Sequence, residues 1–265
     1  MIGIFDSGIG GLSILRSIHK RLPEYRTVYF GDSANAPYGS KTPEEILDLT
    51  WRGVKLLFDE GAVLAILACN TATAQALCTI QKEKLKEYPG RNVLGIVLPT
   101  VEEMVDLNFE SIAILATPST VSSGAYIKEF NKLSPKMKIV QHAPKDWTGF
   151  VEANKVQQKE AQKSVKKHID LILEEQPDTQ AILLACTHFP ALFHAYAGRV
   201  PVPIFAQGGI IAGKLRSYLE RHPEFASNIE QKGDHLYLTS GDPDHVSIAA
   251  EVFMGYKPEF QKRVS

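Results

Sequence analysis

The chain has 265 residues and a formal net charge of −1 at pH 7; 44% of the residues are hydrophobic and 22% are charged. This length allows one large or two modest domains with a substantial core. The near-neutral charge does not favour binding to nucleic acid or to an anionic membrane surface. No apolar run approaches the ~20 residues of a membrane-spanning helix.

The ends and the cysteines of the chain bear on its compartment. Met1 leads directly into an apparent strand, so we expect no signal peptide. The three cysteines are an odd number and none lies in a Cys-x-x-Cys arrangement. This pattern argues against a disulfide framework or a zinc site, and we expect a cytoplasmic protein without a bound metal.

Apolar runs of strand length alternate with helical patterns along nearly the whole chain. The predicted strands are Ile2–Phe5, Thr27–Gly31, Val63–Ala68, Val93–Val97, Ser111–Leu115, Lys138–Gln141, Ala181–Ala185, Val202–Phe205 and Leu236–Thr239. The clearest helix runs from Thr42 to about Glu60, with Thr42 as N-cap and Glu45 completing a capping box. A polar surface helix is predicted from Asn154 to about Glu175.

This alternation predicts an α/β fold with mainly parallel sheets and helices on both faces. The strands fall into two sets, separated near residues 98–100, and the chain crosses back near residues 205–209. We therefore expect two α/β domains. The first is discontinuous and comprises residues 1–98 and 208–265, and the second comprises residues 99–207.

The first turn reads FDSGIGGLSIL and places Asp6 and Ser7 directly after a strand. Its glycines at 8, 10 and 11 suit a tight turn that exposes backbone amides to an anionic group such as a carboxylate. A dinucleotide site is disfavoured because the spacing is not G-x-G-x-x-G. The alternative is a plain turn in which Asp6 caps the helix.

One phrase occurs twice in the chain, as VLAILACNT at residues 63–71 and as AILLACTH at residues 181–188. Each apolar run reads as a buried parallel strand, so Cys69 and Cys186 should lie at the carboxyl ends of strands, where open α/β sheets bind ligands. A helix following Cys69 is expected to lower the pKa of its thiol. His188 lies two residues beyond Cys186 and is a candidate for proton exchange with it. Cys78 is expected in the core.

Other candidate residues lie in loops after strands. Tyr38 and Gly39, in the loop YFGDSANAPYGSKT, are expected to form a wall beside a ligand. Thr117 and Thr120, after the strand at 111–115, are candidates for carboxylate contacts or for capping a helix. Glu152 is either a functional acid or part of a surface helix.

A pair of thiols from two similar halves favours one chemistry over others. A cysteine protease needs only one nucleophilic thiol, and a disulfide oxidoreductase needs thiols that are close together or bonded. Two thiols on opposite sides of a small carboxylate fit two-base proton transfer, in which one removes a proton from a stereocentre and the other delivers one to the opposite face. Amides, hydroxyls and exclusion of water would stabilise the carbanionic transition state.

The turns DSGIGG, DSANAPYG, ACNTATA and LACTHFP, in this order and spacing, resemble those of the glutamate racemases in the cofactor-independent aspartate/glutamate racemase superfamily. The resemblance covers almost the whole chain. It implies two pseudo-symmetric α/β domains with glutamate between them. It also implies L- and D-glutamate interconversion without a cofactor, and a supply of D-glutamate for bacterial peptidoglycan.

The resemblance also assigns roles to residues. It implies that Cys69 is the base toward D-glutamate and Cys186 the base toward L-glutamate, assisted by Asp6 and His188 respectively. The implied substrate-binding residues are Asp6, Ser7, Tyr38, Gly39, Asn70, Thr71, Thr187 and His188. Asp32 and Glu152 match further acidic positions of the family.

The chain departs from the family pattern in two places. Ala143 stands where the family often has a cysteine, and residues 206–208 (Ala-Gln-Gly) replace an Asp-containing turn. Members of the family that are activated by a peptidoglycan precursor have an N-terminal extension, which this chain lacks, so we do not expect that activation here. Three alternatives stay open: racemisation of aspartate, racemisation of a hydantoin, and a non-catalytic carboxylate-binding regulator. The expected partner is a small-molecule substrate, and a homodimer is a hypothesis from the family.

Overall fold

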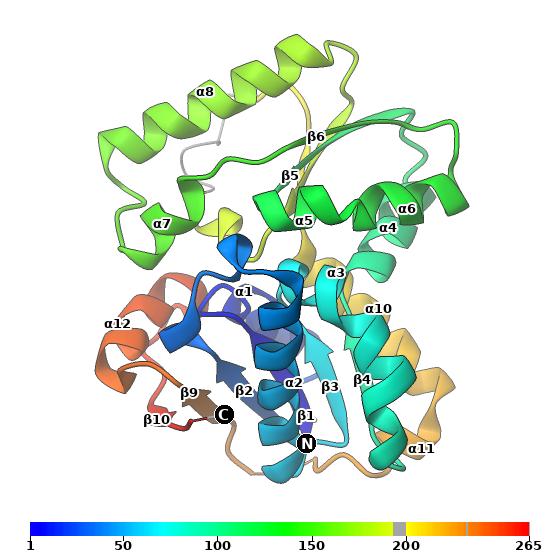
Figure 1. Ribbon diagram of the computed structural model, residues 1–265, viewed down its shortest axis with the longest axis vertical. Coiled ribbons are helices and arrows are strands. Elements are labelled where there is room, and N and C mark those ends of the chain that lie inside the picture. The colour runs from blue at the N-terminus through cyan, green and yellow to red at the C-terminus, as the bar shows by residue number, and fades with distance from the viewer. Residues whose placement is uncertain (193–199, 232, 265) are drawn as a thin grey trace.

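The computed structural model describes residues 1–192, 200–231 and 233–264. Their strands form two sheets, each built of parallel strands, and one sheet lies above the other in Figure 1. The lower sheet has the order β10-β9-β2-β1-β3-β4 and the upper sheet has the order β6-β5-β7-β8. Within the described ranges, none of the helices has the length and apolar character needed to cross a membrane.

All nine predicted strands are present, with small changes in their bounds. The six-stranded sheet contains β1 (Ile2–Asp6), β2 (Thr27–Gly31), β3 (Leu64–Leu67), β4 (Asn92–Gly95), β9 (Leu236–Thr239) and β10 (Phe260–Lys262). The four-stranded sheet contains β5 (Ser111–Ala116), β6 (Lys138–His142), β7 (Ala181–Ala185) and β8 (Ile204–Ala206). The predicted strand 93–97 ends at Gly95 because a helix begins at Val97. The short edge strand β10 was not predicted, since only its Phe260 is buried.

Helices cover both faces of each sheet. They are α1 (Leu12–Arg21), α2 (Pro43–Asp59), α3 (Asn70–Thr79), α4 (Val97–Asp106), α5 (Pro118–Ser123), α6 (Ala125–Leu133), α7 (Trp147–Glu152), α8 (Lys159–Glu175), α10 (Gln207–Arg221), α11 (Pro223–Ala226) and α12 (Pro243–Met254). The predicted capping box of α2 is confirmed. Thr42 Oγ1 accepts from the Glu45 amide at 3.2 Å, and the Thr42 amide donates to Glu45 Oε2 at 2.8 Å.

The prediction of a helix beginning at Asn154 is wrong. Asn154 has a φ of +52°, a left-handed conformation that an α-helix does not contain. The segment instead ends one short helix, α7, at Glu152 and begins α8 at Lys159.

Alternating side chains of the strands build a core on each face of the sheets. In β1, Ile2 and Ile4 pack with residues of α1, α10 and α12, whereas Phe5 packs with residues of α2 and α3. In β5, Ile112 and Ile114 face α4 and α6. This two-sided burial explains why the strands read as continuous apolar runs.

The sheets define what we call the six-stranded half and the four-stranded half. Strands from residues 2–95 and 236–262 form the first, and strands from residues 111–206 form the second. The predicted domain boundaries at 98/99 and 207/208 fall in the first turns of α4 and α10. The division into domains at those residues stays a prediction.

Candidate active site

The two halves enclose a cavity of about 320 Å³ that is lined by both Cys69 and Cys186. Cys69 follows β3 and caps the N-terminus of α3, and Cys186 directly follows β7. Each thiol therefore lies at the carboxyl end of a parallel strand, as expected from the sequence. Because β3 and β7 belong to different sheets, the thiols approach the cavity from different halves.

Most of the residues singled out in the sequence line this cavity. They are Ser7, Tyr38, Gly39, Cys69, Asn70, Thr71, Thr117, Glu152, Cys186, Thr187 and His188. Three others, Asp6, Asp32 and Thr120, are fully buried outside its lining. Their contacts, described below, place them behind residues of the lining.

The Cys69 thiol is 6% exposed and has two polar neighbours. Its sulfur lies 3.5 Å from Ser7 Oγ and accepts a hydrogen bond from the Ala72 amide at 3.4 Å. Burial, followed by the charge of Asp6, raises the pKa of Cys69 to about 12, although both hydrogen bonds act in the opposite direction. The expectation that the helix lowers this pKa is wrong, because desolvation outweighs the helix terminus.

Cys186 has a different environment. Its sulfur lies 4.0 Å from Nδ1 of His188, whose Nε2 lies 2.5 Å from Glu152 Oε1. Burial disfavours the imidazolium of His188, but hydrogen bonds and charges from Cys186 and Glu152 outweigh it and raise the pKa of His188 well above its ordinary value. Burial likewise opposes the Glu152 carboxylate, yet His188 lowers the pKa of Glu152. Glu152 is thus the partner of His188 at the end of α7.

Asp6 lies beneath the cavity, at the end of β1. Its Oδ2 accepts from the Gly8 amide at 3.0 Å, and Thr187 Oγ1 donates to its Oδ1 at 3.3 Å. Burial raises the pKa of Asp6, while the charge of His188 and the amides of Gly8 and Gly11 lower it. The Gly8 amide of this turn therefore binds Asp6 itself, and helix α1 begins at Leu12 without a side-chain cap, so the alternative in which Asp6 caps the helix is wrong.

The glycine at position 10 is required by close packing against the second thiol's neighbours. A Cβ built there would lie 2.5 Å from His188 Nδ1 and 2.5 Å from Thr187 Oγ1. We expect Gly10→Ala to destabilise the protein by ~1–3 kcal/mol through overpacking. Thermal unfolding checks this, with Gly209→Ala as the control. No heavy atom within 4 Å opposes a Cβ at Gly209 on α10, so that variant should keep or gain stability.

Asp32 supports a wall of the cavity from outside it. Its carboxylate accepts from Tyr38 Oη at 2.7 Å, from Ser240 Oγ at 2.6 Å and from Asn35 Nδ2 at 3.0 Å. Burial, and then the charge of Asp32, raises the pKa of the Tyr38 phenol. The structure therefore does not bring Asp32 into contact with the cavity; it fixes the Tyr38 side chain.

Three threonines join the two halves beside Cys69. Thr71 Oγ1 on α3 lies 2.9 Å from Thr117 Oγ1, which lies 2.9 Å from Thr120 Oγ1. Thr117 also accepts from the Thr120 amide at 3.3 Å, so it caps α5. Thr71 and Thr117 face the cavity, and Thr120 lies behind them.

The sequence reasoning missed two parts of the lining. Lys145, Thr148 and Gly149 line the cavity from the loop after β6 and from α7. The position of Lys145 shortly after a strand was a usable signal, because strand ends supply this site throughout. Within the described chain, no group of three metal-ligating side chains is present.

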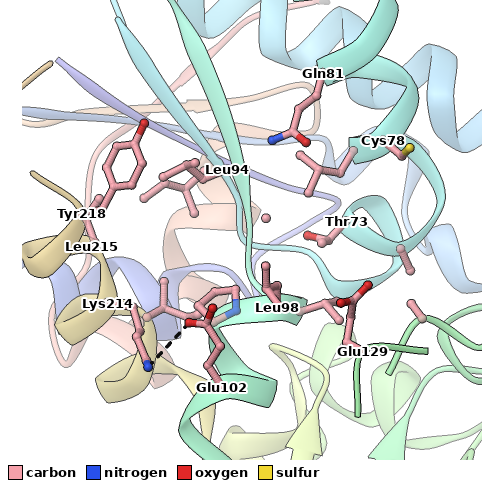
Figure 2. A pocket seen from close by; sticks show the side chains of 18 of the residues that line it. Thr73, Cys78, Gln81, Leu94, Leu98, Glu102, Glu129, Lys214, Leu215 and Tyr218 are labelled. Atoms are coloured by element: carbon pink, nitrogen blue, oxygen red, sulfur yellow. Dashed lines mark ion pairs between the residues drawn. The ribbon is translucent and has the colours of Figure 1, made fainter. Parts of the chain in front are cut away.

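A larger cavity, of about 590 Å³, lies between α3, β4, α4 and α10 (Figure 2). Figure 2 shows Cys78 on its wall and Lys214 beside Glu102, with Nζ and Oε2 3.6 Å apart. Cys78 is exposed, so its predicted place in the core is wrong. Of the two thiols at strand ends, neither lines this cavity, and it therefore lacks the paired arrangement of the smaller one.

Comparison with known proteins identifies the family. The Asp/Glu/Hydantoin racemase family model matches residues 3–213. The chain belongs to this family. The resemblance inferred from the four turns is thereby confirmed, and the chain is placed among the isomerases.

The relatives and the similar structures agree with one another. The chain is 37% identical to a glutamate racemase from Ruegeria pomeroyi, over 96% of each chain, and 35% identical to one from Jannaschia, over 98% of each. The crystal structure of glutamate racemase RacE1 from Bacillus anthracis superposes with a TM-score of 0.89 at 26% identity, covering 100% of this chain and 97% of that one. The two-sheet α/β fold expected from the sequence is therefore confirmed.

Proposed function

We propose that this protein interconverts L-glutamate and D-glutamate by two-base proton transfer at Cα, without a cofactor. The observation that carries the proposal is the pair of buried thiols, Cys69 and Cys186, which reach one cavity from two sheets. Each direction requires a base on one face of the stereocentre and an acid on the other. Two thiols on opposite faces supply both.

The two thiols have unequal surroundings, which suit them to different roles in each direction of the reaction. Cys69, with a pKa of about 12, carries its proton at neutral pH and is ready to act as the acid. His188 Nδ1 lies 4.0 Å from the Cys186 sulfur, and we assign the role of the base toward L-glutamate to this thiol. In the L-to-D direction the Cys186 thiolate removes the proton of L-glutamate and Cys69 protonates the opposite face, which yields D-glutamate. Exchange of the two roles gives the reverse reaction.

Several donors line the cavity for the two carboxylates of the substrate. Ser7, Thr71 and Thr117, which carry hydroxyls, line it, whereas the hydroxyl of the lining residue Thr187 donates to Asp6. Hydrogen bonds from such donors stabilise charge that develops on the α-carboxylate as the proton leaves. Asp6 does not reach the cavity and acts through Thr187, whose hydroxyl it binds.

Lys145 is the one lysine or arginine among the described residues that line the cavity, and its side chain is exposed. We expect Lys145→Gln to raise KM for glutamate roughly two- to fivefold, because exposed ion pairs contribute ~0.2–1 kcal/mol. kcat should change little. Kinetics with both enantiomers check this. Lys163→Gln on α8, which does not line this cavity, is the control.

Glutamate is favoured over the alternative substrates by the relatives. The curated proteins that match over nearly the full chain at 35–37% identity are glutamate racemases. An aspartate racemase from Picrophilus torridus superposes with a TM-score of only 0.55 at 19% identity, which speaks to the fold alone.

Circular dichroism of purified protein with each enantiomer tests the proposal. L- and D-glutamate should converge to the racemate with no cofactor added, and Cα should take up deuterium in heavy water. Turnover of aspartate but not glutamate would overturn the substrate assignment. If the Cys69→Ser and Cys186→Ser variants kept all measured activity in the cell, the result would favour a non-catalytic carboxylate-binding regulator. We further propose a cytoplasmic role in supplying D-glutamate for peptidoglycan.

A further inference from the structure

Gln207, the first residue of α10, lies at the centre of a buried hydrogen-bond network. Asn70 Nδ2 donates to Gln207 Oε1 at 2.7 Å, and Gln207 Nε2 lies 3.2 Å from Asn70 Oδ1. Gln207 Nε2 is also 2.9 Å from both Thr100 Oγ1 and Tyr126 Oη. All four side chains are at most 4% exposed. We call these four residues the Gln207 network.

The donors and acceptors of this network fit a glutamine at position 207. Tyr126 Oη donates to Asn70 Oδ1 at 2.7 Å, and Thr100 Oγ1 donates to the Ile96 carbonyl at 2.7 Å. Both hydroxyl hydrogens are therefore used, and both hydroxyl oxygens must accept from the Gln207 amide. An acidic or apolar side chain would leave buried polar groups without a donor, which is unfavourable. Gln207 also lies in the turn that departs from the family pattern.

The network joins the strands that carry the two thiols. Gln207 directly follows β8, which pairs with β7 in the register Leu184 to Ala206. β7 ends one residue before Cys186, and Asn70 is the residue after Cys69. The amide pair thus links the residue next to one thiol with the strand beside the other thiol.

We propose that Gln207 is a positioning residue for the two-thiol reaction, acting through Asn70 to hold Cys69 at its working place opposite Cys186. This inference rests on the proposed function. Proton transfer at a single carbon from opposite faces tolerates little change in the separation of the two sulfurs. A displacement of about 1 Å at a reacting group lowers the rate by about 100-fold.

The test compares the same substitution at two glutamines that both join the halves. Gln207→Met removes the network's central amide at similar length. Gln75→Met on α3 is the control, since the described side-chain hydrogen bonds of Gln75 go to Ser119 on α5, with Nε2 to Oγ at 3.2 Å, and none goes to a member of the Gln207 network. Gln207→Met should lower kcat in both directions about 10- to 100-fold with KM within about threefold, and raise the kinetic isotope effect of Cα-deuterated glutamate. Gln75→Met should leave kcat within about twofold.

Two further measurements keep the proposal testable if Gln207→Met folds poorly. Tyr126→Phe keeps the buried ring and removes only the hydroxyl that binds Asn70, so kcat should fall about 3- to 10-fold. In a double-mutant cycle, adding Gln207→Met to Asn70→Ala should cause no further loss of kcat. Additive losses in the cycle would overturn the action through Asn70.

The outcomes separate this inference from the proposed function. If the wild-type protein does not exchange the Cα hydrogen of glutamate, the proposed function fails. If wild type racemises glutamate and both thiols are needed, but Gln207→Met and Gln75→Met behave alike, only the positioning role fails.

Discussion

Cys69→Ser is expected to lower kcat for racemisation about 10²- to 10⁴-fold in both directions, and Cys186→Ser should do the same. Each direction needs a base on one face of Cα and an acid on the other, so removal of either thiol stops inversion whichever enantiomer is supplied. A serine hydroxyl is far too weak an acid to replace a thiol as the exchanging group. Circular dichroism with L- and with D-glutamate measures the loss.

Hydrogen exchange separates the two faces in these variants. Cys69→Ser keeps Cys186 beside the face of L-glutamate, so L-glutamate should still exchange its Cα hydrogen with heavy water, slowly and without inversion. D-glutamate should lose exchange in that variant. Cys78→Ser, on the wall of the larger cavity, is the matched control and should keep kcat within about twofold. Racemisation at the wild-type rate by either Cys69→Ser or Cys186→Ser would contradict the two-thiol mechanism.

The α/β architecture was predictable because its signal is local. Strands buried on both faces read as continuous apolar runs, and the capping box at Thr42 marks a helix start in four letters. The predictions of secondary structure were wrong or incomplete where the local sequence pattern carries no signal. The left-handed Asn154 interrupts a sequence that is polar and helix-like throughout, and β10 buries only Phe260 of its three residues.

The candidate site was predictable where it depends on strand ends. Each thiol could be placed at the carboxyl end of a strand. The repeated Ala-Cys phrase and the family resemblance then paired Cys69 with Cys186 and His188 across the two halves. Whether a residue after a strand lines the cavity or lies behind its wall could not be inferred in this way. Asp32 and Thr120 follow strands too, but they lie behind Tyr38 and Thr117.

The electrostatic surroundings of the Cys69 thiol could not be predicted from the sequence either. A helix N-terminus was visible after Cys69, but the burial and the Asp6 carboxylate that raise the pKa of its thiol depend on tertiary packing. The positioning role proposed for Gln207 could not be predicted for the same reason, because its hydrogen-bond partner Asn70 lies 137 residues away in the chain. The sequence marked Gln207 only as a departure from a pattern.

His188→Asn is expected to lower kcat about 10- to 100-fold, with a larger loss from L- to D-glutamate than in reverse. The variant removes the imidazolium that lies 4.0 Å from the Cys186 sulfur and is held by Glu152. Without this charge, the negative charge of a thiolate at Cys186 is less stabilised, so less of the thiolate that takes the proton of L-glutamate is available. Glu152→Gln, which removes the charge that helps keep His188 protonated, should have a smaller effect in the same direction.

The unequal effect of His188→Asn on the two directions must be measured in kcat and KM separately, because it does not appear in kcat/KM. L- and D-glutamate are enantiomers with equal free energies, so the equilibrium constant is unity and every variant must have the same kcat/KM in both directions. The loss of kcat from L-glutamate is therefore accompanied by a matching difference in KM. His222→Asn is the control, because His222 forms a similar contact with Glu224, at 2.9 Å, far from the thiols in the chain and outside the cavity lining. If His188→Asn lowers kcat equally from both enantiomers, His188 does not act through Cys186 alone, and the unequal roles assigned to the two thiols are wrong.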